Sequence, residues 1–380
     1  MERKKSLTTW EAACIITGYG VGGGVLTMPY LCEKIGFISA CIVLVIAFLA
    51  SYVLHLMIAD LALKATEGGQ IIACLGQFLF RGKLKNLLTY AFFALMLAIL
   101  CTNLTGYITG AEEIIVSIIP MPSLMAKLIF YFAAAFVVIF GLKAVGVSEK
   151  VAMVVIFAII GILAVASFFV PEKNDVPLFE ANLNGYLAYY GMAMFSLAAF
   201  FSVPQAVEGL NGDKKKIKKA IFLGFLNNFI LIIVINFCAL LSSYEVTEAA
   251  MAGWTKGIGM WAQIVGGLFT VIAMLTTYWS LSLALSDIVK ETVKIGEKPS
   301  WIIATLPSLI LALLNLGGFM EFMRLASGLI SIVIAVMIVP AFHNARTEVS
   351  GSILKKNGLI IEIVICIAYI LMGVGSVIPY

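Results

Sequence analysis

The sequence predicts an all-α polytopic membrane protein with one domain, on three observations. Of its 380 residues, 62% are hydrophobic and 12% are charged, and the mean hydropathy is +1.06. A hydrocarbon layer about 30 Å thick requires roughly 20 apolar residues per helix, and the chain has eleven runs of that kind. Lys and Arg alternate between the two sides of these runs, as membrane insertion favours. This balance excludes a soluble globular domain.

The eleven predicted spans are separated by short polar segments. The first is too long for a cleavable signal and lacks a small-residue cleavage site, so we expect it to remain in the protein. A short cytoplasmic helix is expected at 71–80, and a partly helical external lid at 244–257. The predicted spans are residues 9–34, 36–63, 86–118, 122–141, 150–170, 186–210, 218–241, 258–289, 300–316, 321–342 and 358–378.

The positive-inside rule predicts the orientation. With the N-terminus in the cytoplasm and the C-terminus outside, twenty of the 25 Lys and Arg residues fall on the inner side. The five on the outer side are Lys34, Lys127, Lys173, Lys256 and Arg324. The net charge of +4 is therefore a topology signal, and we expect a lipid bilayer and no nucleic acid as partner.

Enzyme chemistry is not expected. The seven cysteines lie mostly in apolar runs without a CxxC pair, so we assign no disulfide or metal cofactor. His55 and His343 are the chain's two histidines, too few for a Ser/His/Asp triad or a His-rich metal site. Asp60, Asp287 and Glu362 are expected to be solvated at inner interfaces, and Glu321 with Arg324 to form an external surface pair.

The first span contains a cluster of glycines near its middle, Gly18, Gly20, Gly22, Gly23 and Gly24, followed by Pro29. Each glycine weakens a helix by about 1 kcal/mol relative to alanine. A broken helix at that depth is tolerated where its freed backbone lines a cavity, as in secondary transporters. Close helix packing through small residues is the alternative interpretation.

The sixth span contains Pro204, which predicts a break near 199–202. Breaks in spans one and six are five spans apart, and an odd offset reverses the orientation of the second half. This spacing predicts a 5+5 inverted repeat in one transport domain, residues 1–380. Residues 1–170 would form the first repeat, 186–343 the second, and 358–378 an additional helix.

Several stretches resemble one family. Gly22-Gly-Gly-Val-Leu-Thr-Met-Pro-Tyr30, with Gly36, is similar to the GxGxLxxPxA…G signature of amino acid/auxin permeases. Residues 107–110 resemble hydroxy/aromatic amino acid permeases, and residues 204–216 and 276–287 resemble spans six and eight of the amino acid–polyamine–organocation superfamily. The resemblance implies the fold of the bacterial leucine transporter.

The resemblance also implies a site for an α-amino acid at the two breaks. The N–H groups of Gly23 and Gly24, beside Gly22, would bind the carboxylate. Carbonyls of Tyr19 and Gly20 in span one, and of Ala199 and Phe200 in span six, would bind the ammonium group. The aromatic specificity candidates are Tyr107, Phe200, Phe201, Tyr278 and Trp279, and Ser202 is a further substrate-binding candidate.

Coupling to Na⁺ or H⁺ has two candidate locations. Sodium-coupled relatives imply a site formed by Thr276 and Thr277 with the carbonyls of Gly18, Val21 and Ala273; hydroxyls bonded to their own helix are the alternative. Proton-coupled relatives carry a lysine within span five, which this chain lacks between 151 and 163. Gating or proton-binding candidates are Glu112, Glu113 and Glu208.

The predicted function is cation-coupled import of an α-amino acid by alternating access, in a plasma membrane of bacterial type. One alternative is a membrane amino acid sensor, which would be expected to carry an extended cytoplasmic domain. The other is a metal-ion transporter on the same fold, which would require Asp or Asn at the breaks. No Asp or Asn occurs at 17–30 or 191–208.

The orientation can be tested by labelling. A cysteine at Asn182 is expected to react with an impermeant thiol reagent added outside intact cells, and one at Lys216 is not, because of the Lys and Arg asymmetry. Labelling relative to the parent protein is the measurement. The reversed pattern would refute the orientation.

Overall fold

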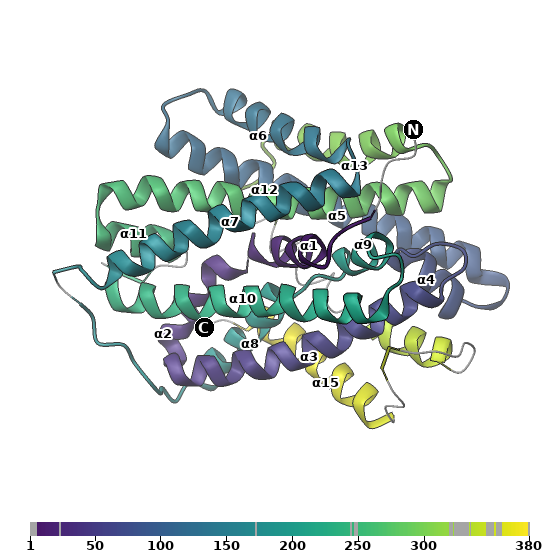
Figure 1. The fold of residues 1–380 in the computed structure, drawn as a ribbon, viewed down its shortest axis with the longest axis horizontal. Helices are drawn as coiled ribbons and strands as arrows, with labels where there is room; N and C mark the ends of the chain where they lie inside the picture. The colour runs from purple at the N-terminus through teal and green to yellow at the C-terminus, as the bar shows by residue number, and fades with distance from the viewer. Residues whose placement is uncertain are drawn as a thin grey trace.

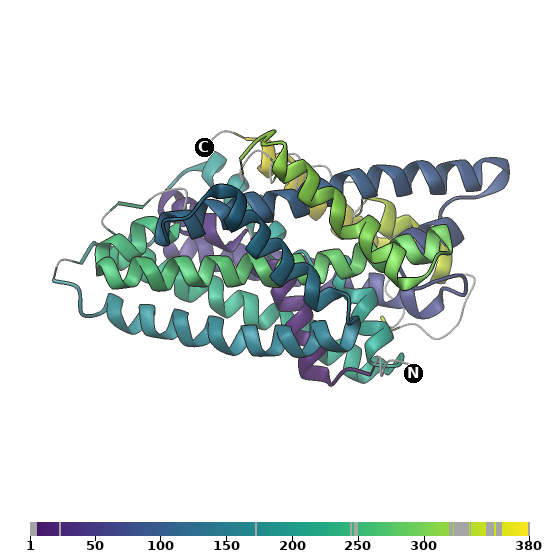
Figure 2. The same cartoon turned by 90° about the horizontal axis from the view of Figure 1, so that it is seen from above.

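The computed structural model describes residues 6–22, 24–171, 173–243, 245–246, 250–318, 322, 334, 336–346, 353–354 and 359–378. Throughout this part of the chain the regular secondary structure is helical. The long helices run along the longest axis of the molecule (Figure 1), and the view from above shows them layered around a central core (Figure 2).

Six helices in the described residues are long and apolar enough to cross a membrane. Two shorter helices, α6 (Ser123–Val138) and α13 (Glu297–Leu313), match the fourth and ninth predicted spans. The tenth predicted span, 321–342, lies mostly outside the described residues, so the count of eleven and the inverted repeat stay predictions. The six long helices are α3 (Phe37–Lys64), α5 (Lys85–Ile118), α7 (Leu142–Ser167), α10 (Lys214–Ser242), α12 (Met260–Val293) and α15 (Leu359–Val377).

The first span is divided, as the glycine cluster predicts. Helix α1 (Thr9–Val21) ends before Gly22, a short 3₁₀ turn η1 covers Val25–Thr27, and α2 (Met28–Ile35) completes the crossing. Pro29 lies in the first turn of α2, where a missing N–H removes no helical hydrogen bond. Helix α1 lies at the centre of the bundle, against α7, α10 and α12 (Figure 1).

The sixth span is also divided. Helix α8 (Leu183–Ser196) and α9 (Ser202–Gly209) are separated by residues 197–201, close to the predicted break. Pro204 falls in the first turn of α9, where backbone N–H groups have no intrahelical acceptor. The proline therefore begins a second half-helix and does not kink a continuous one.

The helices expected in the connecting segments at 71–80 and 244–257 are both present. Helix α4 (Ile71–Phe78) lies on the segment predicted to be cytoplasmic, and α11 (Ala250–Ile258) on the one predicted to be external. Trp254 of α11 is fully buried and its indole Nε1–H donates to Ser167 Oγ at 2.7 Å. This bond joins α11 to the C-terminal end of α7; a lid role for α11 stays a prediction.

Helix α15 packs closely on α8. A β-carbon at Gly375 would lie 2.0 Å from the carbonyl oxygen of Leu187, so this contact requires glycine. The hydroxyl of Tyr190 donates to the carbonyl of Ala368 at 3.2 Å. Tyr369, fully buried, has its ring centroid 6.1 Å from that of Phe200. The helix expected outside the repeat therefore contacts the span-six break.

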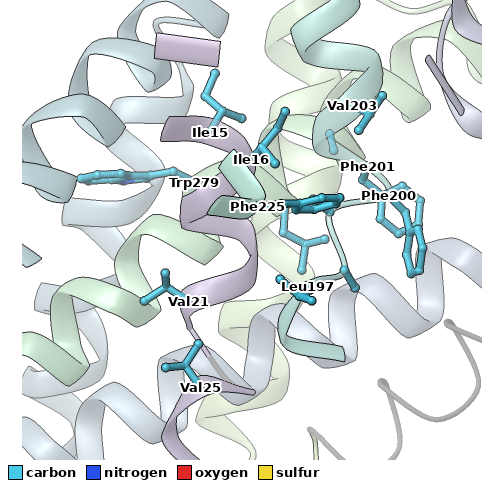
Figure 3. Packing of buried hydrophobic residues seen from close by; sticks show 14 of the residues in the cluster. Ile15, Ile16, Val21, Val25, Leu197, Phe200, Phe201, Val203, Phe225 and Trp279 are labelled. Atoms are coloured by element: carbon cyan, nitrogen blue, oxygen red, sulfur yellow. The ribbon is translucent and has the colours of Figure 1, made fainter. Parts of the chain in front are cut away.

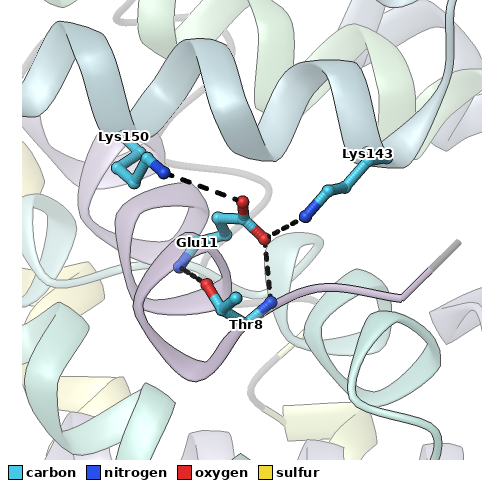
Figure 4. Close-up of polar contacts among 4 residues, drawn as sticks. All are labelled: Thr8, Glu11, Lys143 and Lys150. Carbon is cyan, nitrogen blue, oxygen red and sulfur yellow. Dashed lines mark hydrogen bonds and ion pairs between the residues drawn. The ribbon is translucent and has the colours of Figure 1, made fainter.

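An ionic cluster joins the N-terminal end of α1 to α7 (Figure 4). The buried carboxylate of Glu11 lies 2.6 Å from Lys143 Nζ and 4.0 Å from Lys150 Nζ. Glu11 also closes a capping box with Thr8 at the start of α1. The charge and the cap together hold this end of α1 in one position.

Two carboxylates expected to be solvated are in fact buried. Asp60 lies 3.1 Å from Lys64 and accepts the N–H of Ile353 at 2.7 Å. Glu362 lies 2.8 Å from His343 Nδ1 and 3.2 Å from Arg346. Each prediction was wrong because a partner distant in sequence covers the group. The expected Glu321–Arg324 pair lies outside the described residues.

The ionic cluster generates a prediction about the N-terminal end of α1. Glu11→Gln removes the charge that Lys143 and Lys150 share, so α1 should separate from α7 more often. We expect the alkylation rate of the buried thiol Cys14 to rise about fivefold, for a loss of about 1 kcal/mol. Peptide mapping of the solubilised protein measures this rate.

The control is Glu297→Gln, which breaks the exposed Lys290–Glu297 pair and should leave Cys14 as slow as in the parent. An unchanged rate in Glu11→Gln would show that the cluster does not hold α1.

Candidate functional site

The end of α1 meets α12 through a group of oxygens. The Thr277 Oγ1 hydroxyl donates to the carbonyl of Gly18 at 2.8 Å and lies 3.1 Å from that of Ala273. Thr276 Oγ1 lies 2.8 Å from the Ala273 carbonyl and 3.4 Å from that of Gly18. Four of the five predicted cation ligands are thus together, and Val21 is buried at the adjacent end of α1. Both hydroxyls also bond their own helix, as the alternative interpretation expects.

Glycine is required where α1 meets its neighbours. A β-carbon at Gly22 would lie 2.0 Å from Thr277 Oγ1, and one at Gly18 would lie 2.1 Å from Oε2 of Glu149. A larger residue at Gly22 would press on Thr277 and the Ala273 carbonyl of α12, and one at Gly18 would displace the Glu149 carboxyl of α7. The glycine cluster serves close packing as well as the break, so the two sequence interpretations are both partly right.

Glu149 is a site residue that the sequence interpretation missed. Its side chain on α7 is fully buried, and Oε1 accepts the Ser280 hydroxyl at 2.7 Å. Oε2 has no hydrogen-bond partner among the described residues. The predicted span began at 150, whereas α7 begins at Leu142, which places Glu149 about two turns inside the helix. The sequence is uncharged between residues 151 and 163, and Glu149 lies just before that range.

His55 supports the break of span six and was also missed. The backbone N–H of Ala199 donates to His55 Nε2 at 2.9 Å, and His55 Nδ1 lies 2.6 Å from the Ser51 carbonyl. An Nε2 that accepts and an Nδ1 that donates define a neutral imidazole. The ring also stacks on Phe200, with centroids 5.0 Å apart. His55 therefore fixes both the backbone and a side chain of the break.

One predicted carbonyl already accepts hydrogen bonds within the chain. The Ala199 carbonyl accepts the N–H groups of Ser202 and Val203, at 3.0 and 3.2 Å, and so begins α9. These bonds would compete with an ammonium group for this oxygen; its role in substrate binding stays a prediction. Phe200 differs: its i+4 residue is Pro204, which has no N–H to donate.

The two breaks lie beside each other. A β-carbon at Gly20 would lie 2.4 Å from the Ser196 carbonyl oxygen, and one at Gly24 would lie 2.2 Å from Ser196 Oγ. The rings of Tyr19 and Phe201 are 6.4 Å apart. Figure 3 shows Val21 and Val25 on the first break and Leu197 and Phe200 on the second. Gly23 lies outside the described residues.

Asn228 of α10 is next to this junction. Its Nδ2 would lie 2.4 Å from a β-carbon at Gly20. Both Nδ2 and Oδ1 are buried and lack hydrogen-bond partners among the described residues. Its neighbour Asn227, in contrast, donates to Thr17 Oγ1 at 3.1 Å. An unpaired buried amide is costly, so Asn228 is suited to a polar guest.

The specificity candidates divide into two groups. Tyr107 of α5 is buried near Thr277 and Tyr19, and Phe201 and Ser202 are buried at the span-six break. Trp279 is buried with Nε1 unpaired within the described structure. Tyr278 instead turns to Ser308 Oγ at 3.1 Å and packs on Phe130, on the α6–α13 side.

The three predicted gating carboxylates lie away from the breaks. Glu112 and Glu113 are solvent-accessible near the C-terminal end of α5, and Glu113 lies beside Gly318. Glu208 of α9 is exposed in a pocket also lined by Asp287, Lys143, Lys290 and Glu297. The gating or proton-binding roles of these residues stay predictions.

Comparison with known proteins places this geometry in a family. The chain resembles MhsT in complex with L-phenylalanine (TM-score 0.70, 15% identity, covering 98% of this chain and 100% of that one). It also resembles Mhp1, a nucleobase-cation-symport-1 family transporter in a closed conformation with bromovinylhydantoin bound (TM-score 0.67, 13% identity, covering 98% and 91%).

These similarities show a shared fold, while a sequence search among curated proteins finds no match. The model of the tryptophan/tyrosine permease family matches residues 5–374, nearly the whole chain. The protein is thus a membrane transporter of amino acids and not an enzyme. It belongs to the tryptophan/tyrosine permease family.

Proposed function

We propose that this protein imports an aromatic α-amino acid by alternating access, driven by a cation gradient. The observation that carries the proposal is the pair of adjacent helix breaks with an unpaired amide, Asn228, beside them. Family membership supports an amino acid substrate. The phenylalanine bound to the similarly folded MhsT supports an aromatic one.

The substrate's charged groups match the two breaks. Backbone N–H groups at the start of η1, including that of Gly24, face the carboxylate, since helix N-termini favour anions. The last carbonyls of α1 lack intrahelical donors, and those of Tyr19 and Gly20 face the ammonium group, with that of Phe200 from span six. Tyr107 and Phe201 supply aromatic surface for the side chain.

The coupling cation acts where α1, α7 and α12 meet. The oxygens of Gly18, Ala273, Thr276 and Thr277 are the ligand type that Na⁺ prefers, and the Glu149 carboxyl packs on the same stretch of α1. Either a bound Na⁺ or a proton there would bias the position of the inner half of α1. Family membership favours transport over the sensor and the metal-ion alternatives.

The role of Asn228 can be tested by removing its polarity. Asn228→Leu has similar volume, so we expect tryptophan and tyrosine affinity to fall at least about tenfold. The melting temperature should hold or rise, because two unpaired buried atoms disappear. Tritiated ligand binding and thermal unfolding in detergent measure the two effects.

Asn227→Leu is the matched control on the same helix. Losing its bond to Thr17 should lower the melting temperature, whereas Asn228→Leu should keep or raise it. Unaltered affinity in Asn228→Leu would place the substrate elsewhere.

Transport itself is tested in proteoliposomes with Na⁺ and pH gradients imposed separately. We expect labelled tryptophan, tyrosine or phenylalanine to accumulate under one of these gradients and to leak out when it is collapsed. Binding without accumulation under either gradient would favour a sensor and contradict the proposal.

A further inference from the structure

His55 of α3 is a fully buried imidazole whose orientation is fixed from several sides. Its ring stacks on Phe200, with centroids 5.0 Å apart and an interplanar angle of 8°, and meets Phe225 of α10 edge to face at 4.7 Å. Nε2 accepts the Ala199 N–H at 2.9 Å, so Nδ1 carries the proton and donates to the Ser51 carbonyl, one turn earlier on the same helix. The imidazole is therefore a rigid hydrogen-bond acceptor for the span-six break.

Three contacts hold Ala199 and Phe200 in the break. His55 accepts the Ala199 N–H, and the first N–H groups of α9 donate to the Ala199 carbonyl. The Phe200 ring contacts His55 and also Tyr369 of α15, at 6.1 Å between centroids. The next carbonyl along the chain is that of Phe200, to which Pro204 has no N–H to donate. Because the backbone before this carbonyl and the side chain beside it are both held, the carbonyl has little freedom to turn.

The acceptor nitrogen of His55 does more than fill space in the bundle. An apolar ring of the same size would still pack against Phe200 and Phe225, but it would leave the Ala199 N–H without this acceptor. Ala199 is buried, and an unpaired N–H inside a membrane bundle is costly. The segment would therefore turn to find another acceptor, and the Phe200 carbonyl would turn with it. Binding sites need their polar groups held to within about 0.5 Å of the productive geometry.

We propose that His55 is a positioning residue for recognition of the substrate's ammonium group. Through the Ala199 N–H it directs the Phe200 carbonyl at that group, without touching the substrate itself. The inference rests on the proposed function, in which this carbonyl faces the ammonium group. It assigns to His55 the selection of α-amino acids over the corresponding carboxylic acids that lack the amine.

The test compares His55→Gln with His55→Asn, two amides that differ by one methylene. Glutamine places an acceptor oxygen near the position of Nε2 and can keep the Ala199 bond, whereas asparagine is too short to reach it. Tritiated tryptophan or tyrosine is displaced from the solubilised protein by the unlabelled amino acid and by its analogue without the amine, indole-3-propionate in the case of tryptophan. The ratio of the two affinities is the measurement.

We expect this ratio to fall about tenfold in His55→Asn, in the range of one hydrogen bond to a charged group, and to stay within about twofold of wild type in His55→Gln. A general loss of packing would weaken both ligands alike and leave the ratio unchanged, because the two ligands share the ring and the carboxylate. The control is His343→Gln, which replaces the chain's other histidine where it pairs with Glu362 and should leave both affinities unchanged.

The outcomes separate the two proposals. Wild-type protein that binds neither amino acid, or binds it no better than the analogue without the amine, would contradict the proposed function itself. A wild-type ratio in His55→Asn, or an equal fall in both amide variants, would overturn the positioning role alone. If His55→Asn fails to insert, His55→Phe replaces it, because phenylalanine keeps a ring against Phe200 and removes the acceptor. The ratio should again fall about tenfold, and an unmoved ratio would overturn the proposal.

Discussion

The structure depends on how the backbone polar groups exposed by two helix breaks find partners inside a membrane bundle. Each group left unpaired in hydrocarbon costs several kcal/mol. The Thr277 hydroxyl donates to the Gly18 carbonyl, and His55 accepts the Ala199 N–H. The first N–H groups of α9 donate to the Ala199 carbonyl. The junction of the two breaks lies beside Asn228, whose amide is also unpaired among the described residues, and this is where we propose that the amino acid binds.

Helix α1 connects the features that the proposed function uses. Its N-terminal end is held by Glu11 against α7, its middle covers Glu149 and contacts α12 at Gly18, and its C-terminal end meets span six at Gly20. A movement of this segment changes all of these contacts together. In the proposed function, coupling between ion and substrate therefore passes through one short helix, without a long chain of intermediates.

Local sequence was informative where the structure follows from backbone chemistry. Glycines and Pro204 determine where a helix can continue, and this property is independent of the neighbours, so both breaks were predictable. The hydroxyls of Thr276 and Thr277 were correctly placed against Gly18, although by family resemblance. The apolar runs likewise revealed the membrane class, because hydrocarbon thickness sets their length.

Tertiary structure decided which polar groups are buried and which partner each has. His55 lies 144 residues from Ala199 along the chain, and Ser280 is 131 from Glu149, separations that no local pattern encodes. The burial of Glu149 depended on where α7 begins. The burial of Asp60 and Glu362 depended on segments that fold over them. Sequence alone thus determined the membrane class, the family and the positions of the breaks. The identity of the acid beside α1 emerged only from packing, since burial is a property of neighbours and not of the residue.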